Sequence, residues 1–269
     1  MTLSLGARIK ETRESMAFSQ EQLAIMLGVS RPTLTQIEAD KRKLSPEELK
    51  KLSLIFDISI DFLLSGKKDQ NISIPTEQKE KFEKLILYIL SKVWAKYNVG
   101  KVVLYKLLYF SEFDFFEMHG KNLSGYPFIK LPMGPAPWAF DSLIWEMKER
   151  HEMETIITEY NGYFQQRFIP NIPVFEDTFS HEEQSVIDDV LKRYSDYSAR
   201  DISEKSHEDK PWQIANDMEI IAYDLVRFRE YPFSPLARTQ KKQETQSFAK
   251  MTGFFDDLAS EPDLYEEYR

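Results

Sequence analysis

The stretch SQEQLAIMLGVSRPTLTQIE, residues 19–38, carries the clearest structural pattern in the chain. Ser19 and Gln22 have the spacing of a capping box, in which each side chain bonds the other residue's backbone N–H at a helix start. Gly28 ends that helix, because glycine adopts a positive φ angle without strain. Ser30 is placed to cap a second helix, with Pro32 tolerated in its first turn. The pattern predicts two short helices joined by a tight turn.

The rest of the first 65 residues continues as short helices with marked beginnings. Ser45 and Glu48 form a second capping box, and Ser59 is placed to begin a last helix. Each helix has an apolar side, made by Leu23, Ala24, Leu27, Leu34, Ile37, Leu49, Leu52, Phe56, Phe62 and Leu63. We therefore expect residues 1–66 to form a compact all-α domain of five helices.

After a polar linker at residues 67–75, the chain becomes rich in aromatic residues. Long helices are expected over residues 76–97 and 100–119, and a strand over 126–131. The residues from Met133 to Pro137 are expected to form a rigid turn that starts a helix reaching residue 150. Asn161-Gly162, between two alternating runs, predicts a β-hairpin. Further helices are expected over residues 180–194, 199–206 and 211–218. Residues 76–233 therefore read as an α+β domain, mainly helical with a short antiparallel sheet, followed by an acidic tail at 234–269.

Composition argues against catalysis. The chain has no cysteine, which excludes disulfides and thiolate metal sites, and its four histidines lack metal-ligand spacing. Glu112 and Asp114 are two residues apart on a predicted helix, so they point to different faces and cannot work as a carboxylate pair. Only nine glycines occur, and none builds a phosphate-binding loop. We predict no enzymatic activity, no metal and no cofactor.

Charge and hydropathy suggest where the protein acts. Residues 1–68 hold 11 Lys/Arg and 9 Asp/Glu, a net charge of +2, whereas the remaining residues hold 24 and 35, a net of −11. A DNA-binding unit carried by an acidic body fits this division, although +2 is also ordinary for a small domain. No apolar run approaches the ~20 residues of a membrane helix, and no signal peptide is evident. We expect a cytoplasmic location and no membrane partner.

Residues 19–38 closely resemble the signature of the Xre/Cro helix-turn-helix family. The similarity extends to Leu44-Ser45-Pro46 and to Phe62-Leu63-Leu64. It implies a bacterial or phage regulator whose third helix enters the major groove of operator DNA, acting as a homodimer on two half-sites. One departure is Ala39-Asp40, where the family has a glycine. Asp adopts left-handed conformations more readily than most residues, so the turn remains possible.

The resemblance and the residue chemistry together predict the DNA contacts. Arg31 can bind guanine and Gln36 can bind adenine, each through two hydrogen bonds, and Thr33 can contact a thymine methyl group or a phosphate. Gln20 and the basic run at 41–43 are placed to contact phosphates. The alternative for each is a solvated side chain. The full predicted set is Gln20, Ser30, Arg31, Pro32, Thr33, Thr35, Gln36, Lys41, Arg42 and Lys43.

Residues 101–114, KVVLYKLLYFSEFD, resemble the opening helix of the Panacea (SocA-like) antitoxin domain. The similarity continues through His119-Gly120, Leu123-Ser124-Gly125, Phe128-Ile129-Lys130 and the run from Met133 to Pro137. Ser206-His207-Glu208 and Pro211-Trp212 also suit the family. The resemblance covers roughly residues 80–227 and implies a domain that neutralises a co-expressed toxin. Taken alone, the same residues indicate a buried helix and a fixed turn.

The tail carries apolar residues at helical spacing among acidic ones. It is either a helix docked on its own domain or a segment that binds the partner. The predicted partner-binding residues are Phe254, Phe255, Asp256, Asp257 and Tyr265. We expect a type II antitoxin that binds a toxin and represses its own operon. The alternatives are a phage or lysogeny repressor without a toxin, and an adaptor that delivers a partner to a protease.

Overall fold

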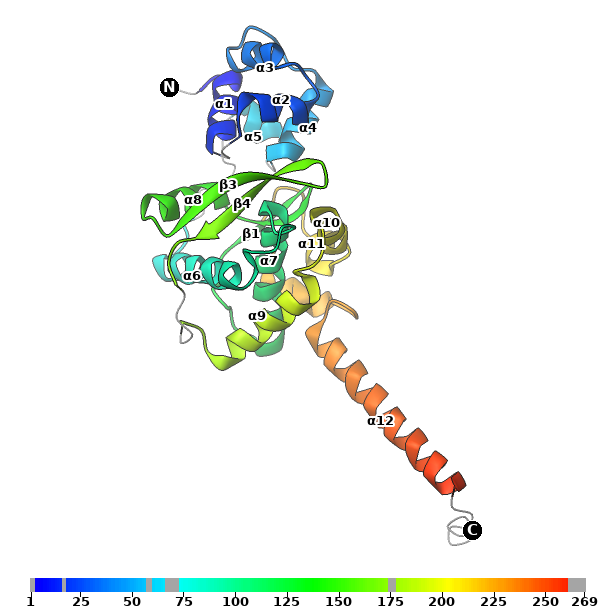
Figure 1. Ribbon diagram of the computed structural model, residues 1–269. Helices are drawn as coiled ribbons and strands as arrows, with labels where there is room; N and C mark the ends of the chain where they lie inside the picture. The colour runs from blue at the N-terminus through cyan, green and yellow to red at the C-terminus, as the bar shows by residue number, and fades with distance from the viewer. Residues whose placement is uncertain (1–2, 16–17, 57–59, 66–72, 174–177, 261–269) are drawn as a thin grey trace.

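The structure is a computed structural model that describes residues 3–15, 18–56, 60–65, 73–173 and 178–260. Within these ranges, the side chains of Ser15, Leu54, Asp61, Phe62 and residues 249–260 are not described. The predicted start of a helix at Ser59 lies outside the described residues. Five N-terminal helices pack at one end of a larger α+β body, and a long helix leaves the body at the opposite end (Figure 1).

The five predicted N-terminal helices are confirmed. They are α1 (Leu5–Ser15), α2 (Gln20–Leu27), α3 (Arg31–Glu38), α4 (Pro46–Phe56) and α5 (Ile60–Ser65). Their core consists of Ile9, Phe18, Leu23, Ala24, Leu27, Leu34, Ile37, Leu52, Phe56 and Leu63. Ser19 and Gln22 form the expected capping box, and Gly28 ends α2 in the left-handed region with φ 80°. The local sequence signals therefore determine where α2 begins and ends.

Asp40, which stands where the resembled signature has glycine, takes the left-handed conformation with φ 56°. Its carboxylate accepts hydrogen bonds from the Ser4 hydroxyl and, at 2.8 Å, from the Gly6 backbone N–H. The Ser4 bond first, and then the Gly6 bond, hold the pKa of Asp40 below its usual value. Gly6 lies where α1 crosses α3, and a Cβ there would lie 2.8 Å from the Glu38 carbonyl oxygen. Asp40 thus closes the third helix against the start of the first.

The second part of the chain is mainly helical. Its helices are α6 (Thr76–Val93), α7 (Lys101–His119), α8 (Phe140–Glu149), α9 (His181–Tyr194), α10 (Ala199–His207), α11 (Lys210–Ile214) and the 3-10 helix η2 (Tyr223–Phe228). Most residues of α7 are buried, and α9, α10, η2 and the two β-pairs contact it. A helix that is apolar almost all round has to be covered on every side, so α7 forms the centre of the body.

The two β-pairs show what the sequence predicts well and what it does not. β3 (Met153–Tyr160) and β4 (Tyr163–Pro170) form the predicted hairpin, with Asn161 and Gly162 at φ 51° and 80°. β1 (Phe128–Leu131) pairs antiparallel with β2 (Gly134–Pro137), a strand in place of the predicted rigid turn. Proline lacks a backbone donor and is depleted in strands, but in a two-stranded pair its nitrogen can face outward. Helix α8 consequently begins later than predicted.

The β3–β4 hairpin lies between the N-terminal helices and the body (Figure 1). Ile157 and Phe164 pack against the apolar core of the N-terminal helices. On the other face, Gln165 donates to the Tyr97 carbonyl at 2.6 Å, and Arg167 donates to the Lys96 carbonyl at 3.1 Å. One hairpin therefore contacts both parts of the molecule.

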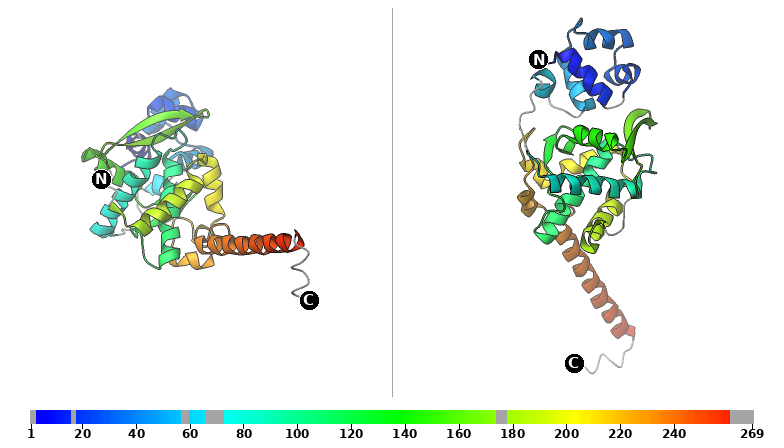
Figure 2. Two further views of the ribbon diagram at one scale, coloured as in Figure 1. Left: turned by 60° about the horizontal axis from the view of Figure 1, so that its bottom comes forward. Right: turned by 90° about the vertical axis from the view of Figure 1, so that its left-hand side faces the viewer.

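Helix α12 (Pro235–Ser260) extends away from the body (Figure 2). Residues 239–248 are exposed along its first half. This arrangement differs from a helix docked along its own domain. Among the described residues, no helix is both long and apolar enough to span a bilayer.

Candidate DNA interface and the charge network of the body

Helix α3 presents one polar face to solvent. Leu34 and Ile37 are buried in the N-terminal core, whereas Arg31, Thr35 and Gln36 are exposed. Within the described residues, neither Arg31 nor Gln36 forms a side-chain hydrogen bond or ion pair, so both can contact an incoming ligand. Figure 1 shows α3 at the end of the molecule opposite α12. The body therefore leaves this face open.

The hydroxyl groups of α3 have local partners. Ser30 Oγ accepts from the Thr33 N–H at 3.3 Å, and the two hydroxyl oxygens lie 2.8 Å apart. The Thr35 hydroxyl donates to the Arg31 carbonyl at 3.1 Å. Serine and threonine hydroxyls satisfy backbone groups at helix starts in this way. The face therefore offers one guanidinium and one side-chain amide as its principal hydrogen-bonding groups.

A buried glutamate on α3 holds this helix against its neighbours. Glu38 Oε1 receives Arg13 Nε from α1 at 2.6 Å, and Glu38 Oε2 receives Gln20 Nε2 from α2 at 2.8 Å. The Arg13 and Glu38 side chains are only 8% and 3% exposed. Gln20, predicted to contact phosphate, has its amide bonded to Glu38 in this structure. The sequence gives no local signal for this three-helix tie, because its members are far apart in the chain.

The basic run after α3 is not uniform. Arg42 Nη1 and Nη2 each lie 3.0 Å from Glu48 Oε1, so its guanidinium is already paired. Lys41 and Lys43 are exposed. The predicted phosphate contact of this run consequently depends mainly on the two lysines.

In the body, the buried carboxylate of Glu112 holds the loop before β1. It accepts from the Ser124 N–H at 3.1 Å, the Gly125 N–H at 3.2 Å and the Tyr223 hydroxyl at 3.1 Å, as well as from the Ser124 hydroxyl. Burial raises the pKa of Glu112, while these hydrogen bonds act to lower it. With its donors already supplied by the protein, Glu112 serves to fix the loop.

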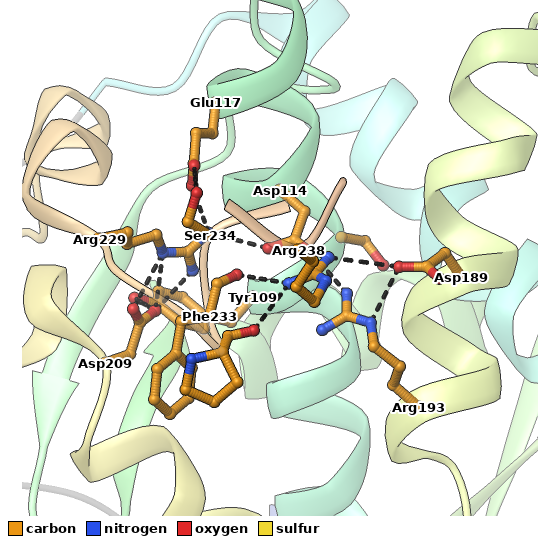
Figure 3. A network of polar contacts seen from close by, with 12 residues as sticks. Tyr109, Asp114, Glu117, Asp189, Arg193, Asp209, Arg229, Phe233, Ser234 and Arg238 are labelled. Carbon is orange, nitrogen blue, oxygen red and sulfur yellow. Dashed lines mark hydrogen bonds and ion pairs between the residues drawn. The ribbon is translucent and has the colours of Figure 1, made fainter. Parts of the chain in front are cut away.

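Two residues further along α7, Asp114 lies at the centre of an arginine cluster (Figure 3). Its side chain is 1% exposed, and Oδ1 receives Arg229 Nη1 at 2.8 Å. Asp114 Oδ2 receives Arg193 from α9 at 2.5 Å and Arg238 from α12 at 3.0 Å. Asp114 on α7 therefore binds α9, α12 and the residue that directly follows η2.

Arg229 links this cluster to a second buried carboxylate. Arg229 Nη2 lies 2.5 Å from Asp209 Oδ2, and the Tyr109 hydroxyl donates to the same oxygen at 2.8 Å. Burial acts to lower the pKa of Arg229, but Asp209 and Asp114 outweigh it and raise that pKa well above its usual value. Burial and then Asp209 raise the pKa of Tyr109. The cluster is charge-paired and offers no free base or nucleophile.

Two family models match the chain in separate places. The helix-turn-helix model matches residues 9–63, which contain α2, the turn and α3. The model described as antitoxin SocA-like, Panacea domain, matches residues 104–213, which contain most of α7 and extend into α11. The chain joins a helix-turn-helix domain to a Panacea domain. Both resemblances inferred from sequence are thereby confirmed.

Three similar proteins are named as regulators or activators of transcription. The HTH-type transcriptional regulator ImmR of Bacillus subtilis is 36% identical over 62 residues, 23% of this chain and 49% of that protein. The SPbeta prophage-derived HTH-type regulator YonR, also of B. subtilis, is 39% identical over 61 residues, 23% of this chain and 56% of its own length. The transcriptional activator BcrR of Enterococcus faecalis is 32% identical over 87 residues, 32% of this chain and 42% of that activator. The chain spans about half the length of these relatives. No solved structure matches it.

The remaining predicted site residues belong to the C-terminal tail. Phe254, Phe255, Asp256 and Asp257 fall in α12, but their side chains are outside the described residues, as is Tyr265. His207, at the end of α10, stacks on Trp212 with ring centroids 4.2 Å apart. Across the described ranges, no group of three or more His, Asp or Glu side chains is arranged to hold a metal ion.

Proposed function

We propose that this protein is a type II antitoxin that binds and neutralises a toxin and represses its own operon. The observation that carries the proposal is the union of a helix-turn-helix domain, with an exposed α3, and a Panacea domain in one chain. Operator DNA with two half-sites calls for a homodimer. Both proposed partners, the operator and the toxin, place the protein in the cytoplasm. The activity is binding rather than catalysis.

We further propose that the C-terminal tail takes part in toxin binding. Helix α12 projects from the body, and the described part beyond its first turn is exposed, with the Phe248 side chain 63% exposed. Residues 239–269 hold four basic and seven acidic residues. A toxin that acts on nucleic acid or nucleotides presents a basic surface, so charge complementarity would speed the encounter. Aromatic residues such as those at 254 and 255 commonly supply the anchoring contacts of an interface.

The test is co-expression with the neighbouring gene, followed by capture of its product and calorimetry on the purified pair. Deletion of residues 240–269 is expected to weaken toxin binding by at least ~2 kcal/mol, because anchoring contacts dominate interface energy. Operator binding by the same truncated protein is the control and is expected to be unchanged. Equal toxin affinities would contradict the role of the tail and move the neutralising surface to the region of Glu112–Pro137.

A second candidate is a phage-type repressor that binds DNA and no toxin. It is supported by the relatives, which are named as transcriptional regulators and include a prophage-derived one. The two candidates differ in the co-expression experiment. Protection of cells from the neighbouring gene product supports the antitoxin, whereas operator binding without protection supports the repressor.

A further inference from the structure

Two polar links join the base of α12 to α7. Ser234 Oγ accepts from the Ala237 N–H at 3.0 Å, which caps α12, and its hydroxyl donates to Glu117. Arg238 Nη2 donates to Asp114 Oδ2 at 3.0 Å (Figure 3). Asp114 and Glu117 lie about one turn apart on α7, and the two donors lie about one turn apart at the base of α12. Two links separated by a turn on each helix fix the direction of α12 as well as its position.

Arg238 is also held from two other sides. Its Nη1 donates to the carbonyl oxygens of Phe233, at 2.6 Å, and Pro232, at 3.2 Å. Its Nη2 lies 3.3 Å from Asp189 on α9. The Arg238 side chain is 19% exposed and that of Asp114 is 1% exposed, so salt screens this pair less than it would a surface pair. The guanidinium therefore bridges α7, α9 and the segment that leads into α12.

Beyond this base, the described part of the helix makes few contacts with the rest of the molecule, one of which places Lys241 Nζ 3.9 Å from the centroid of the Tyr231 ring. Residues 239–248 are all exposed, and α7 is the element that α12 chiefly contacts among the described residues. A helix that is exposed on all sides cannot take its direction from packing. Its direction has to come from its base, where these links lie beside the buried Phe233 and Pro235.

We propose that Arg238 and Asp114 are positioning residues that hold α12 as an oriented arm. This inference rests on the proposed function only for the arm's purpose, which is to present the tail to the toxin. Orienting a binding segment before the encounter removes part of the ordering cost that association otherwise carries. The charge network in the Panacea-containing body would then act on partner binding without contacting the partner.

The absence of cysteine allows a direct distance measurement. Spin labels on Lys84→Cys in α6 and Gln246→Cys in α12, both exposed positions, report the angle between the body and the arm by double electron–electron resonance. Gln246 is ~17 Å along the helix from its start, so a tilt of ~20° moves the label by ~6 Å. We expect one narrow distance distribution in the full chain and at least a twofold broader one after Arg238→Ala.

Lys242→Ala is the matched control, since Lys242 is an exposed basic residue one turn further along the same helix. It should leave the distribution narrow. Circular dichroism and the melting temperature verify that each variant is folded, and Ser234→Ala, which removes the second link, tests the same geometry independently. Unchanged widths in folded Arg238→Ala and Ser234→Ala proteins would overturn the inference, as would a broad distribution in the unmutated arm.

The spin-label distance is measured on the protein without toxin. It therefore tests the positioning of α12 separately from the proposed function. With the captured toxin, Arg238→Ala is expected to lower the affinity at least fivefold while Lys242→Ala leaves it within twofold. A broadened distribution together with an unchanged toxin affinity would instead contradict the proposed role of the tail in neutralisation.

Discussion

At the scale of single residues, Arg31 and Gln36 carry the proposed sequence readout. Arg31→Ala and Gln36→Ala should each cost ~1–3 kcal/mol on the true operator and little on random DNA, because each removes a two-bond contact to a base edge. Electrophoretic shifts on both DNAs measure this, with Lys50→Ala, an exposed lysine on α4, as the control. Equal losses on operator and random DNA would show that these side chains do not read bases.

Glu38 is a second residue with a specific expected effect. Glu38→Ala leaves the Arg13 guanidinium buried and without its principal partner, and breaking such a pair costs ~3–5 kcal/mol. We therefore expect the free energy of unfolding of the N-terminal helices to fall by about 3 kcal/mol in denaturant titration. Glu11→Ala, at an exposed position of α1, is the control. Similar denaturation midpoints for Glu38→Ala and Glu11→Ala would contradict a stabilising role for the contact of Glu38 with Arg13.

At the scale of elements, the loop after α3 should supply the general electrostatic attraction to DNA. Replacing Lys41 and Lys43 together by Ala should reduce the slope of log affinity against log salt by about 2, since each phosphate contact releases close to one counterion. Arg42→Ala should change the slope by less than either lysine, because Arg42 is paired with Glu48. A slope that changes in Arg42→Ala but not in the variant lacking Lys41 and Lys43 would contradict this assignment.

The β3–β4 hairpin should couple the two parts of the molecule. Phe164→Ser removes an apolar contact with the N-terminal core, so we expect a single unfolding transition to separate into two in calorimetry. Ile156→Ser is the matched control, since Ile156 lies on the opposite face of the same hairpin and is 37% exposed. A single transition in both variants would mean that the hairpin contact does not link the two units.

The elements that sequence predicted best are those whose signals are local. The capping boxes at Ser19 and Ser45 and the Asn161-Gly162 turn each involve residues within a few positions of one another, and the structure has all three. The β2 strand was missed because its two prolines argue against a strand, and only the pairing with β1 outweighs that preference.

The charge network could not be predicted for the opposite reason. Arg193, Arg229 and Arg238 meet at Asp114 from positions 79, 115 and 124 residues away, and nothing in their local sequence distinguishes them from surface arginines. The α3 face could be foreseen because the spacing of Leu34 and Ile37 fixes which side of a short helix is buried. Its tie through Glu38 again depended on contacts between distant segments.

At the scale of the whole molecule, the two proposed binding regions are far apart. Helix α3 lies at one end and α12 projects from the other, with the Panacea-containing body between them (Figures 1 and 2). A partner held on α12 would leave the proposed DNA-binding face of α3 in the same chain open. This arrangement favours simultaneous binding, in which the proposed complex with a toxin would occupy the operator.

We propose that one chain divides repression and neutralisation between its two ends. The most direct test measures both functions in the same cells. Toxin-dependent growth and an operator-driven reporter are measured together for the full chain, for the Arg31→Ala/Gln36→Ala double variant and for a chain ending at residue 239. We predict that the double variant protects growth but releases the reporter, and that the shortened chain represses the reporter but fails to protect. Loss of both functions in either folded variant, or retention of both in the shortened chain, would contradict the account.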